Sequence, residues 1–333
     1  MPRSFYRTLL CIVPFALTET ETVAGQAPTR TQRAQFWGFA GPWDTASSNT
    51  IRNHGGKLAA AITGWITLDS ATGQPLLPSP YPDTTNPRTG TPDRMAIITT
   101  WQGEGFHPEP IRRLGEDAGG LARAAGAIGR HAGEMRYAGL VLDFELLEGR
   151  DLPAFLRVAR AIGDSARSHG VRIIAIAIPA TDTVGYPGRT LLTVADALIP
   201  MLYDQHWSGS EPGPIAEPEW VRQALALRIA EVGPARIVAG LPTYGYRWRK
   251  GRPTESIGYI EAREMAKSDR GSLQRDPRTR FLRSRGGRDS EIWVSDAQLL
   301  AILVNQSRAM GVHRFAIWRL GQEDPEIWRS VIR

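Results

Sequence analysis

The chain has 333 residues, of which 42% are hydrophobic and 22% charged, a balance typical of a folded globular domain and not of disordered, collagen-like or membrane-spanning chains. The formal net charge is +6, but the arginines are scattered along the chain without a basic run, which argues against nucleic acid as a partner. The single cysteine, Cys11, excludes an intramolecular disulfide and a zinc site built from thiolates.

The N-terminal segment has the layout of a secretory signal peptide. Arg3 and Arg7 accompany an apolar stretch at 8–17, and small residues follow around Gly25. An ordinary membrane-spanning helix needs about 20 apolar residues, so this stretch is too short to be one. We therefore expect residues 1–25 to be a signal peptide and residues 26–333 to be exported to the periplasm or the medium, without a membrane span.

The same segment predicts the cleavage point. The small residues place cleavage between Ala24 and Ala27. N-terminal sequencing of the exported protein measures it, and an exported chain that still begins before Thr18 would contradict the assignment.

Eight apolar segments of strand length recur along the rest of the chain. Several are almost continuous in Ile, Val, Leu and Ala, as strands covered on both faces of a parallel sheet require. These segments are 35–40, 58–68, 95–101, 139–145, 171–178, 197–203, 236–241 and 313–318.

Helical stretches alternate with these strands. Residues 152–169 carry apolar side chains at helical spacing and stop before Gly170, and residues 117–135, 218–232 and 295–310 follow the same pattern. The alternation predicts an α/β fold, namely a (β/α)8 TIM barrel in one domain. A doubly wound open sheet is the alternative, and the lack of a glycine-rich phosphate motif after any strand weakens it. The arginine-rich segment 247–291, before the last strand, is predicted to be a small insertion.

The fourth strand segment ends in two carboxyl groups, Asp143 and Glu145. Strand side chains alternate between faces, so this pair shares one face while Leu140, Leu142 and Phe144 share the other. Catalytic groups of TIM barrels lie at the C-terminal ends of the strands, so we expect the pair in the barrel mouth. Two close carboxyl groups in a partly desolvated site do not both ionise readily. A protonated acid beside a carboxylate is what cleavage of a glycosidic bond requires.

Other strand ends carry polar and aromatic side chains. Met201 and Tyr203 share a face of the sixth segment, and Asp204 follows them. Aromatic side chains suit stacking on sugar rings, and we expect the tryptophans near strand ends to gather at the barrel mouth. These tryptophans are Trp43, Trp65, Trp101, Trp207, Trp248 and Trp318. The histidines lack metal-ligand spacing and no nucleotide motif is present, so the sequence predicts neither a metal nor a cofactor.

Taken in order, these motifs resemble the catalytic domain of glycoside hydrolase family 18, the chitinase-like family. GLVLDFE at 139–145 is similar to the family signature D-G-x-D-x-D-x-E, and MLYD at 201–204 is similar to its M-x-Y-D. LPTYGYRW at 241–248 and AIWRLGQEDPEIW at 316–328 resemble later segments of the family. The opening GFAGPWDTASSNTI and EIWVSDAQLL at 291–300 resemble the branch of spore-germination and chitooligosaccharide-processing hydrolases.

The resemblance implies retaining, substrate-assisted hydrolysis of β-linked N-acetylglucosamine glycans. Glu145 would be the acid and then the base, Asp143 would orient the acetamide of the substrate, and Tyr203 would hydrogen-bond that acetamide. The resemblance and the aromatic pattern together give a substrate-binding set of Met201, Asp204, Trp318, Tyr244, Trp43 and Trp101.

The sequence also departs from the family pattern. Ala138 and Val141 stand where the signature has aspartates, and Tyr246 stands where the family often has arginine. Without the middle aspartate, the proton coupling around Asp143 must differ. A non-hydrolysing glycan-binding protein on the same barrel is therefore an alternative, and an envelope scaffold that binds a partner through 247–291 is another. Retention of Glu145 favours the glycosidase. The glycan stays open between chitin, peptidoglycan and exopolysaccharide, and we expect a monomer.

Overall fold

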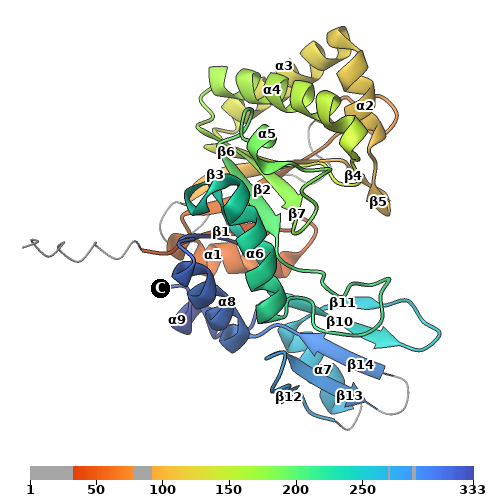
Figure 1. Ribbon diagram of the computed structural model, residues 1–333, viewed down its shortest axis with the longest axis vertical. Coiled ribbons are helices and arrows are strands. Elements are labelled where there is room, and N and C mark those ends of the chain that lie inside the picture. The colour runs from red at the N-terminus through yellow and green to blue at the C-terminus, as the bar shows by residue number, and fades with distance from the viewer. Residues whose placement is uncertain (1–32, 78–91, 269–270, 287–289) are drawn as a thin grey trace, which may run out of the picture. The chain divides into compact units, whose positions relative to one another are not determined.

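The structure is a computed structural model that describes residues 33–77, 92–268, 271–286 and 290–333. Its central element is a ring of parallel strands (Figure 1). The strands are β1 (Gln35–Ala40), β2 (Ala60–Thr67), β3 (Asp93–Thr99), β6 (Gly139–Asp143), β7 (Ile173–Pro179), β8 (Ala197–Met201), β9 (Ala239–Pro242) and β15 (Arg314–Leu320). They close into a barrel in the order β1-β15-β9-β8-β7-β6-β3-β2, which confirms the predicted TIM barrel.

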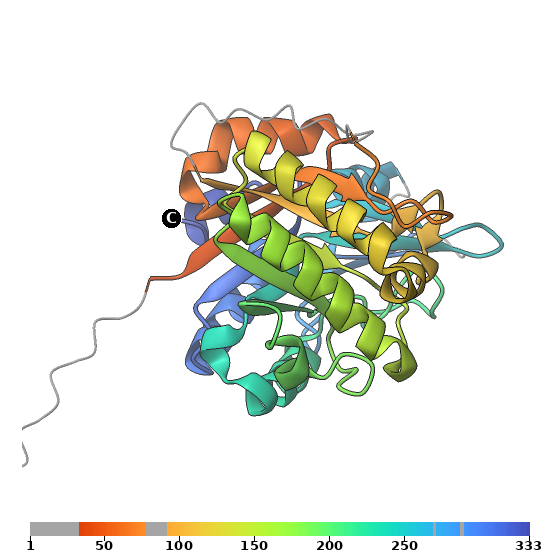
Figure 2. The same cartoon turned by 90° about the horizontal axis from the view of Figure 1, so that it is seen from above.

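Helices connect the strands and cover the outside of the barrel. They are α1 (Thr45–His54), α2 (Glu109–Glu116), α3 (Ala118–Glu134), α4 (Leu152–Ser168), α5 (Gly188–Leu191), α6 (Pro218–Val232), α8 (Ala297–Ala309) and α9 (Ile327–Ser330). Short 3₁₀ turns lie at Gly55–Lys57, Gly149–Asp151 and Pro234–Arg236. Helices α3 and α4 run side by side over the strands (Figure 2). Helix α4 stops before Gly170, whose φ of +94° is a left-handed conformation that glycine adopts without a steric penalty.

Strand alternation sorts the apolar side chains into two layers. Val141 of β6 packs inside the barrel, in a cluster with Ile97. The neighbouring Leu140, Leu142 and Phe144 pack outside, in a cluster that includes residues of α3 and α4. This is the predicted division of the fourth strand, and it sends the side chain of the last strand residue toward the barrel mouth.

The insertion predicted before the last strand is a separate antiparallel sheet with one helix. Its elements are β10 (Tyr244–Arg249), β11 (Glu255–Gly258), α7 (Tyr259–Ser268), β12 (Gln274–Arg275), β13 (Leu282–Gly286) and β14 (Ser290–Val294). The sheet order is β11-β10-β14-β13-β12. The insertion is wider than the predicted 247–291, because β10 begins directly after β9 and pairs with both β11 and β14. A small hairpin, β4 (Trp101–Gln102) and β5 (Gly105–Phe106), follows β3.

The predicted signal peptide, residues 1–25, lies outside the described residues. Within the described part of the chain, no helix is both long and apolar enough to cross a membrane. Residues 34–333 form a single compact unit.

Candidate active site

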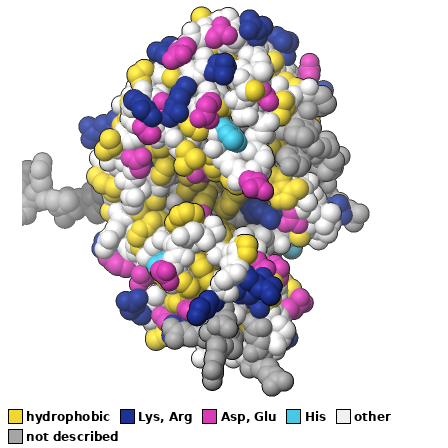
Figure 3. All heavy atoms as spheres, turned by 90° about the vertical axis from the view of Figure 1, so that its right-hand side faces the viewer, with side chains coloured by type: hydrophobic (Ala, Val, Ile, Leu, Met, Phe, Trp, Pro, Cys, Tyr) yellow, Lys and Arg dark blue, Asp and Glu magenta, His cyan; other side chains and the backbone are white. Residues whose placement is uncertain are grey.

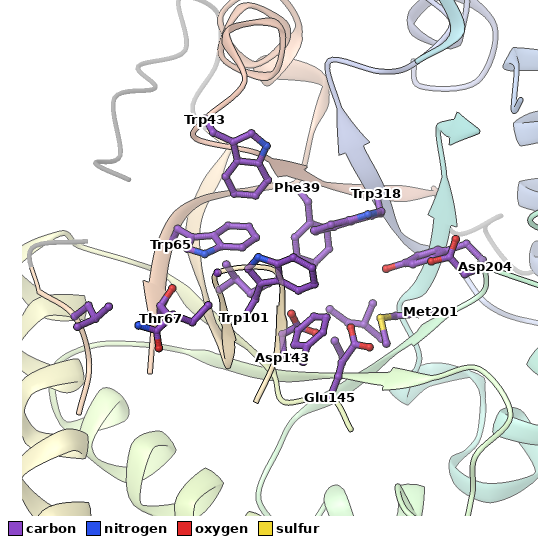
Figure 4. Close-up of a pocket in the computed structure, with 18 residues that line it drawn as sticks. Phe39, Trp43, Trp65, Thr67, Trp101, Asp143, Glu145, Met201, Asp204 and Trp318 are labelled. Carbon is purple, nitrogen blue, oxygen red and sulfur yellow. The ribbon is translucent and has the colours of Figure 1, made fainter. Parts of the chain in front are cut away.

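A cavity of about 620 Å³ opens at the C-terminal ends of the barrel strands. Figure 3 shows a hollow lined with hydrophobic side chains, and Figure 4 shows the cavity residues in close-up. The charged residues that line it are Asp143, Glu145 and Asp204. The aromatic residues are Phe39, Trp43, Trp65, Trp101, Phe106, Tyr203 and Trp318. The others are Thr67, Leu76, Ile97, Gln102, Gly103, Ala177, Ile199 and Met201. No lysine, arginine or histidine is among these lining residues.

Asp143 is the last residue of β6 and is 7% exposed. Thr99 lies opposite it on β3, and its hydroxyl donates a hydrogen bond of 3.1 Å to Oδ2 of Asp143. Burial raises the pKa of Asp143, while the Thr99 hydrogen bond opposes the rise. Buried carboxylates are usually paired with a cation, but the hydrogen-bond donor to Asp143 is the neutral hydroxyl of Thr99.

Glu145 lies just beyond the end of β6, where the chain leaves the barrel. The next residue, Leu146, has a φ of +59°, so the backbone turns sharply after Glu145. Burial raises the pKa of Glu145, and the nearby carboxyl groups of Asp143 and Asp204 raise it further. The pKa of Glu145 rises to about 9 and that of Asp143 to about 7, so Glu145 is the member of this pair that holds its proton more firmly near neutral pH.

Asp204 is held by two tyrosines of the insertion sheet. Tyr244 and Tyr246 both donate to its Oδ1, the latter at 3.1 Å. The two tyrosines share one face of β10, and a Cβ on the intervening Gly245 would lie 2.0 Å from the carbonyl oxygen of Trp293. Desolvation raises the pKa of Asp204, whereas the tyrosine hydrogen bonds lower it. Tyr246, the departure from the family pattern, thus acts as a neutral support of Asp204.

The aromatic side chains form a deep part and a rim. Trp318 contacts Phe39 edge to face at a centroid distance of 5.3 Å, and Trp65 is only 6% exposed. Trp43 and Trp101 are 49% and 41% exposed, so they lie at the rim. Trp43 stands edge-on against Trp65 at 4.7 Å. Such half-exposed indoles beside a polar centre are suited to contact with sugar faces.

Most of the predicted site residues meet at this cavity. Asp143, Glu145, Met201, Tyr203, Asp204, Trp318, Trp43 and Trp101 all line it. Tyr244 does not line it and instead supports Asp204 from behind. The expectation that all six tryptophans gather at the mouth is wrong for two of them. Trp207 and Trp248 are not lining residues, and Trp248 is 7% exposed and donates its indole N–H to the Ser210 carbonyl at 3.1 Å.

Sequence reasoning missed several lining residues. Phe39, Thr67 and Ile97 lie on β1, β2 and β3, and their inward strand faces could have been found by the same alternation that identified Asp143. Gln102 and Phe106 lie on the short β4–β5 hairpin, for which the sequence gives no periodic signal. Within the described residues, no cluster of three or more His, Cys, Asp or Glu side chains could hold a metal ion.

Comparison with known proteins finds glycosylases in sequence and chitinases in structure. No protein-family model matches the chain. A Bacillus subtilis protein named as a sporulation-specific glycosylase, YdhD, is 27% identical over 252 residues, which are 72% of this chain and 59% of that protein. The cortical fragment-lytic enzyme of Bacillus subtilis is 25% identical over 250 residues, covering 70% of this chain and 58% of that enzyme. The chain thus spans less than two thirds of the length of these two relatives.

Among solved structures, a chitinase from Chromobacterium violaceum superimposes with a TM-score of 0.75 at 18% identity, over 90% of this chain and 98% of that one. At that identity the likeness shows the shared fold. The barrel, the acid pair at its mouth and the sequence similarities agree with a chitinase-like domain. They support a domain of glycoside hydrolase family 18, which confirms the resemblance seen in the motifs.

The raised pKa of Glu145 predicts a pH-dependent stability. In the unfolded chain this carboxyl has an ordinary pKa, so above that value the native state binds more protons and the free energy of unfolding falls as pH rises. Glu145→Gln cannot titrate. We expect it to match the wild type near pH 4 and to gain a stability advantage of about 1.4 kcal/mol per pH unit as the pH rises toward neutral. Chemical denaturation at a series of pH values measures this.

The matched control is Glu219→Gln on α6. Glu219 is exposed, and hydrogen bonds from Arg222 and then Gln223 lower its pKa, so its loss should bring no stabilisation at neutral pH. An advantage of Glu145→Gln that stays constant with pH would contradict the raised pKa.

Proposed function

We propose that this chain is an exported glycosidase that cleaves β-linked N-acetylglucosamine glycans with retention, using the acetamide of the substrate as the nucleophile. The observation that carries the proposal is the proton-holding Glu145 beside Asp143 in an aromatic cavity. The names of the relatives, which are a glycosylase, a cortical fragment-lytic enzyme and a chitinase, support glycosidase activity. Export is part of the proposal and rests on the pattern of residues 1–25.

Glu145 begins the reaction as the general acid. Its proton is transferred to the glycosidic oxygen as the bond to C1 breaks, so the leaving sugar departs as a neutral alcohol. The resulting carboxylate then takes a proton from water, which attacks C1 from the vacated side. The raised pKa supports both steps, because a carboxyl that is protonated at neutral pH can donate and be restored in each cycle.

Asp143 and Tyr203 act on the acetamide. The acetamide oxygen attacks C1 while its N–H faces the Asp143 carboxylate, which stabilises the positive charge of the oxazolinium formed. The Tyr203 hydroxyl has no hydrogen-bond partner among the described residues, so it is available to the same acetamide. Asp204 is less suited to be a nucleophile, because Oδ1 already accepts two tyrosine hydrogen bonds.

The charges of the cavity favour an uncharged sugar at the reacting position. Its lining includes three carboxyl groups and no cation, so an anionic sugar would bring a further negative charge without a partner. The proposed substrate is therefore a neutral N-acetylated glycan. A glycan-binding protein without turnover is not favoured, because binding alone needs no proton-holding acid and the relatives carry the names of lytic enzymes.

Substitution of the acid pair tests the division of roles. Glu145→Gln should lose about 10²–10⁴-fold in turnover of natural glycans and less in the first step with activated aryl leaving groups, which need little protonation. Asp143→Asn should impair both substrate types, because acetamide attack precedes departure in each. Steady-state kinetics with both substrate types measure this. Glu148→Gln, an exposed position in the same loop, is the control and should retain activity. Full activity of Glu145→Gln would overturn the site assignment.

A panel of oligosaccharides tests the nucleophile and the substrate charge. Fully N-acetylated chains should be cleaved, and chains de-N-acetylated at the reacting position should not, because they lack the internal nucleophile. Chains with a carboxylate-bearing sugar at that position should be cleaved poorly. Mass spectrometry of the products gives the result. Efficient cleavage at a deacetylated unit, or a covalent sugar trapped on Asp204, would show a conventional two-carboxylate mechanism instead.

A further inference from the structure

The backbone around Glu145 forms an arch that one buried phenol closes. Strand β6 ends at Asp143, and the chain turns back at Leu146 with its φ of +59°. On one side of Glu145, the Tyr186 hydroxyl donates to the carbonyl oxygen of Phe144 at 2.8 Å. On the other side, the backbone N–H of Leu147 donates to the same hydroxyl oxygen at 3.1 Å. The backbone before Glu145 and the backbone after it are thus hydrogen-bonded to the same atom, the hydroxyl oxygen of Tyr186.

The phenol itself is firmly held. Tyr186 is 1% exposed, and its ring packs edge to face against Phe155 of α4 at a centroid distance of 6.0 Å. Phe155 in turn packs against Phe144 at 5.7 Å. Burial raises the pKa of Tyr186 above its already high ordinary value, so the hydroxyl stays neutral and keeps its donor proton at any working pH.

A fully buried arginine fixes the loop that carries Tyr186. Arg228 of α6 donates to the carbonyl oxygens of Tyr186 at 3.0 Å and Ala180 at 3.1 Å. It also donates to the carbonyl oxygens of Pro179 and Asp182. The charge is balanced by Glu231, three residues further along the helix, at 2.7 Å. The guanidinium therefore joins α6 to the whole segment from the end of β7 to Tyr186.

We propose that Tyr186 is a positioning residue that aims the Glu145 carboxyl at the glycosidic oxygen, with Arg228 fixing the loop behind it. The expected loss of kcat rests on the proposed function, whereas the expected change in the position and pKa of Glu145 rests on the arch alone. Tyr186 lies outside every motif that carried the family resemblance, and it does not line the cavity. Its role is to hold the backbone on both sides of Glu145, and the position of that backbone sets the direction of the Glu145 carboxyl.

Loss of the phenol oxygen frees the arch while keeping the ring. Without it, the Phe144 carbonyl and the Leu147 N–H lose their common partner, and the left-handed turn at Leu146 loses the two hydrogen bonds that hold it. The arch relaxes toward solvent and takes Glu145 with it. The carboxyl becomes better hydrated and further from Asp143, so its pKa falls and the acid is no longer aligned with the leaving oxygen.

The test is Tyr186→Phe in the full chain. We expect kcat on unactivated N-acetylated oligosaccharides to fall by about 10- to 100-fold with little change in KM, and activated leaving groups to be affected less. We also expect the pKa of Glu145 to fall, as measured by carboxyl ¹³C NMR without substrate and assigned with Glu145→Gln. Arg228→Lys, which keeps the charge but has fewer donors, should give a smaller change in the same direction and serves where Tyr186→Phe folds poorly.

Two controls separate positioning from general stability. Tyr137→Phe removes the hydroxyl of another tyrosine, 3% exposed, that precedes β6 at the opposite end of the same strand, and kcat should not change. Phe155→Leu weakens the packing of the Tyr186 and Phe144 rings but keeps the phenol and its hydrogen bonds, so it should lower the melting temperature with a much smaller loss of kcat than Tyr186→Phe.

Each outcome decides the proposal. Unchanged kcat and unchanged Glu145 pKa in Tyr186→Phe would overturn it, and so would a loss of kcat in Phe155→Leu equal to that in Tyr186→Phe. A wild-type chain that cleaves no glycan, combined with a lowered Glu145 pKa in Tyr186→Phe, would overturn the proposed function while supporting the positioning role.

Discussion

Three carboxyl groups meet at one apolar cavity with no cation among its lining residues, and the organisation of the site depends on this constraint. Desolvation and mutual repulsion disfavour three negative charges there. Two of the groups are supported by neutral donors, Asp143 by Thr99 and Asp204 by two tyrosines. Glu145 has no hydrogen-bond donor among the described residues and keeps its proton instead. Asp143 and Asp204 accept hydrogen bonds that favour their ionised forms, whereas Glu145 accepts none from the described residues. This difference in hydrogen bonding makes Glu145 the protonated acid among three similar groups.

The departures from the family signature fit this constraint. Val141, in place of the middle aspartate, packs inside the barrel beneath Asp143, so no further carboxyl shares the proton of the site. The polar support of Asp143 comes instead from the neighbouring strand, through Thr99. Tyr246, in place of an arginine, supplies Asp204 with a neutral donor. Val141 removes a carboxyl that would titrate together with Glu145, and Tyr246 removes a fixed positive charge near Asp204.

The sequence predicted what depends on local periodicity and missed what depends on contacts between distant segments. Apolar strands and alternating helices were sufficient for the barrel, and alternation along β6 was sufficient to pair Asp143 with Glu145. Position beyond a strand end did not determine the direction of a side chain. Trp248 of β10 is buried and donates to the Ser210 carbonyl, and it does not line the cavity. Thr99 and Tyr186 could not be predicted, because their hydrogen bonds cross between strands or loops more than 30 residues apart in sequence.

The absence of cations from the cavity lining bears on the residue that follows Trp318. The next residue is Arg319, a cation adjacent in sequence to the aromatic floor of the cavity. Arg319 is not a lining residue of the cavity, and its guanidinium pairs with Asp44 and lies 5.8 Å from the centroid of the Trp43 ring. An arginine directed into the cavity would relieve the repulsion among the carboxyl groups and stabilise the fold. It would also favour the ionised form of Glu145 and so remove the proton that the proposed mechanism requires. The ion pair with Asp44 thus gives Arg319 a partner outside the set of cavity residues, and the same guanidinium packs over the ring of the rim tryptophan Trp43.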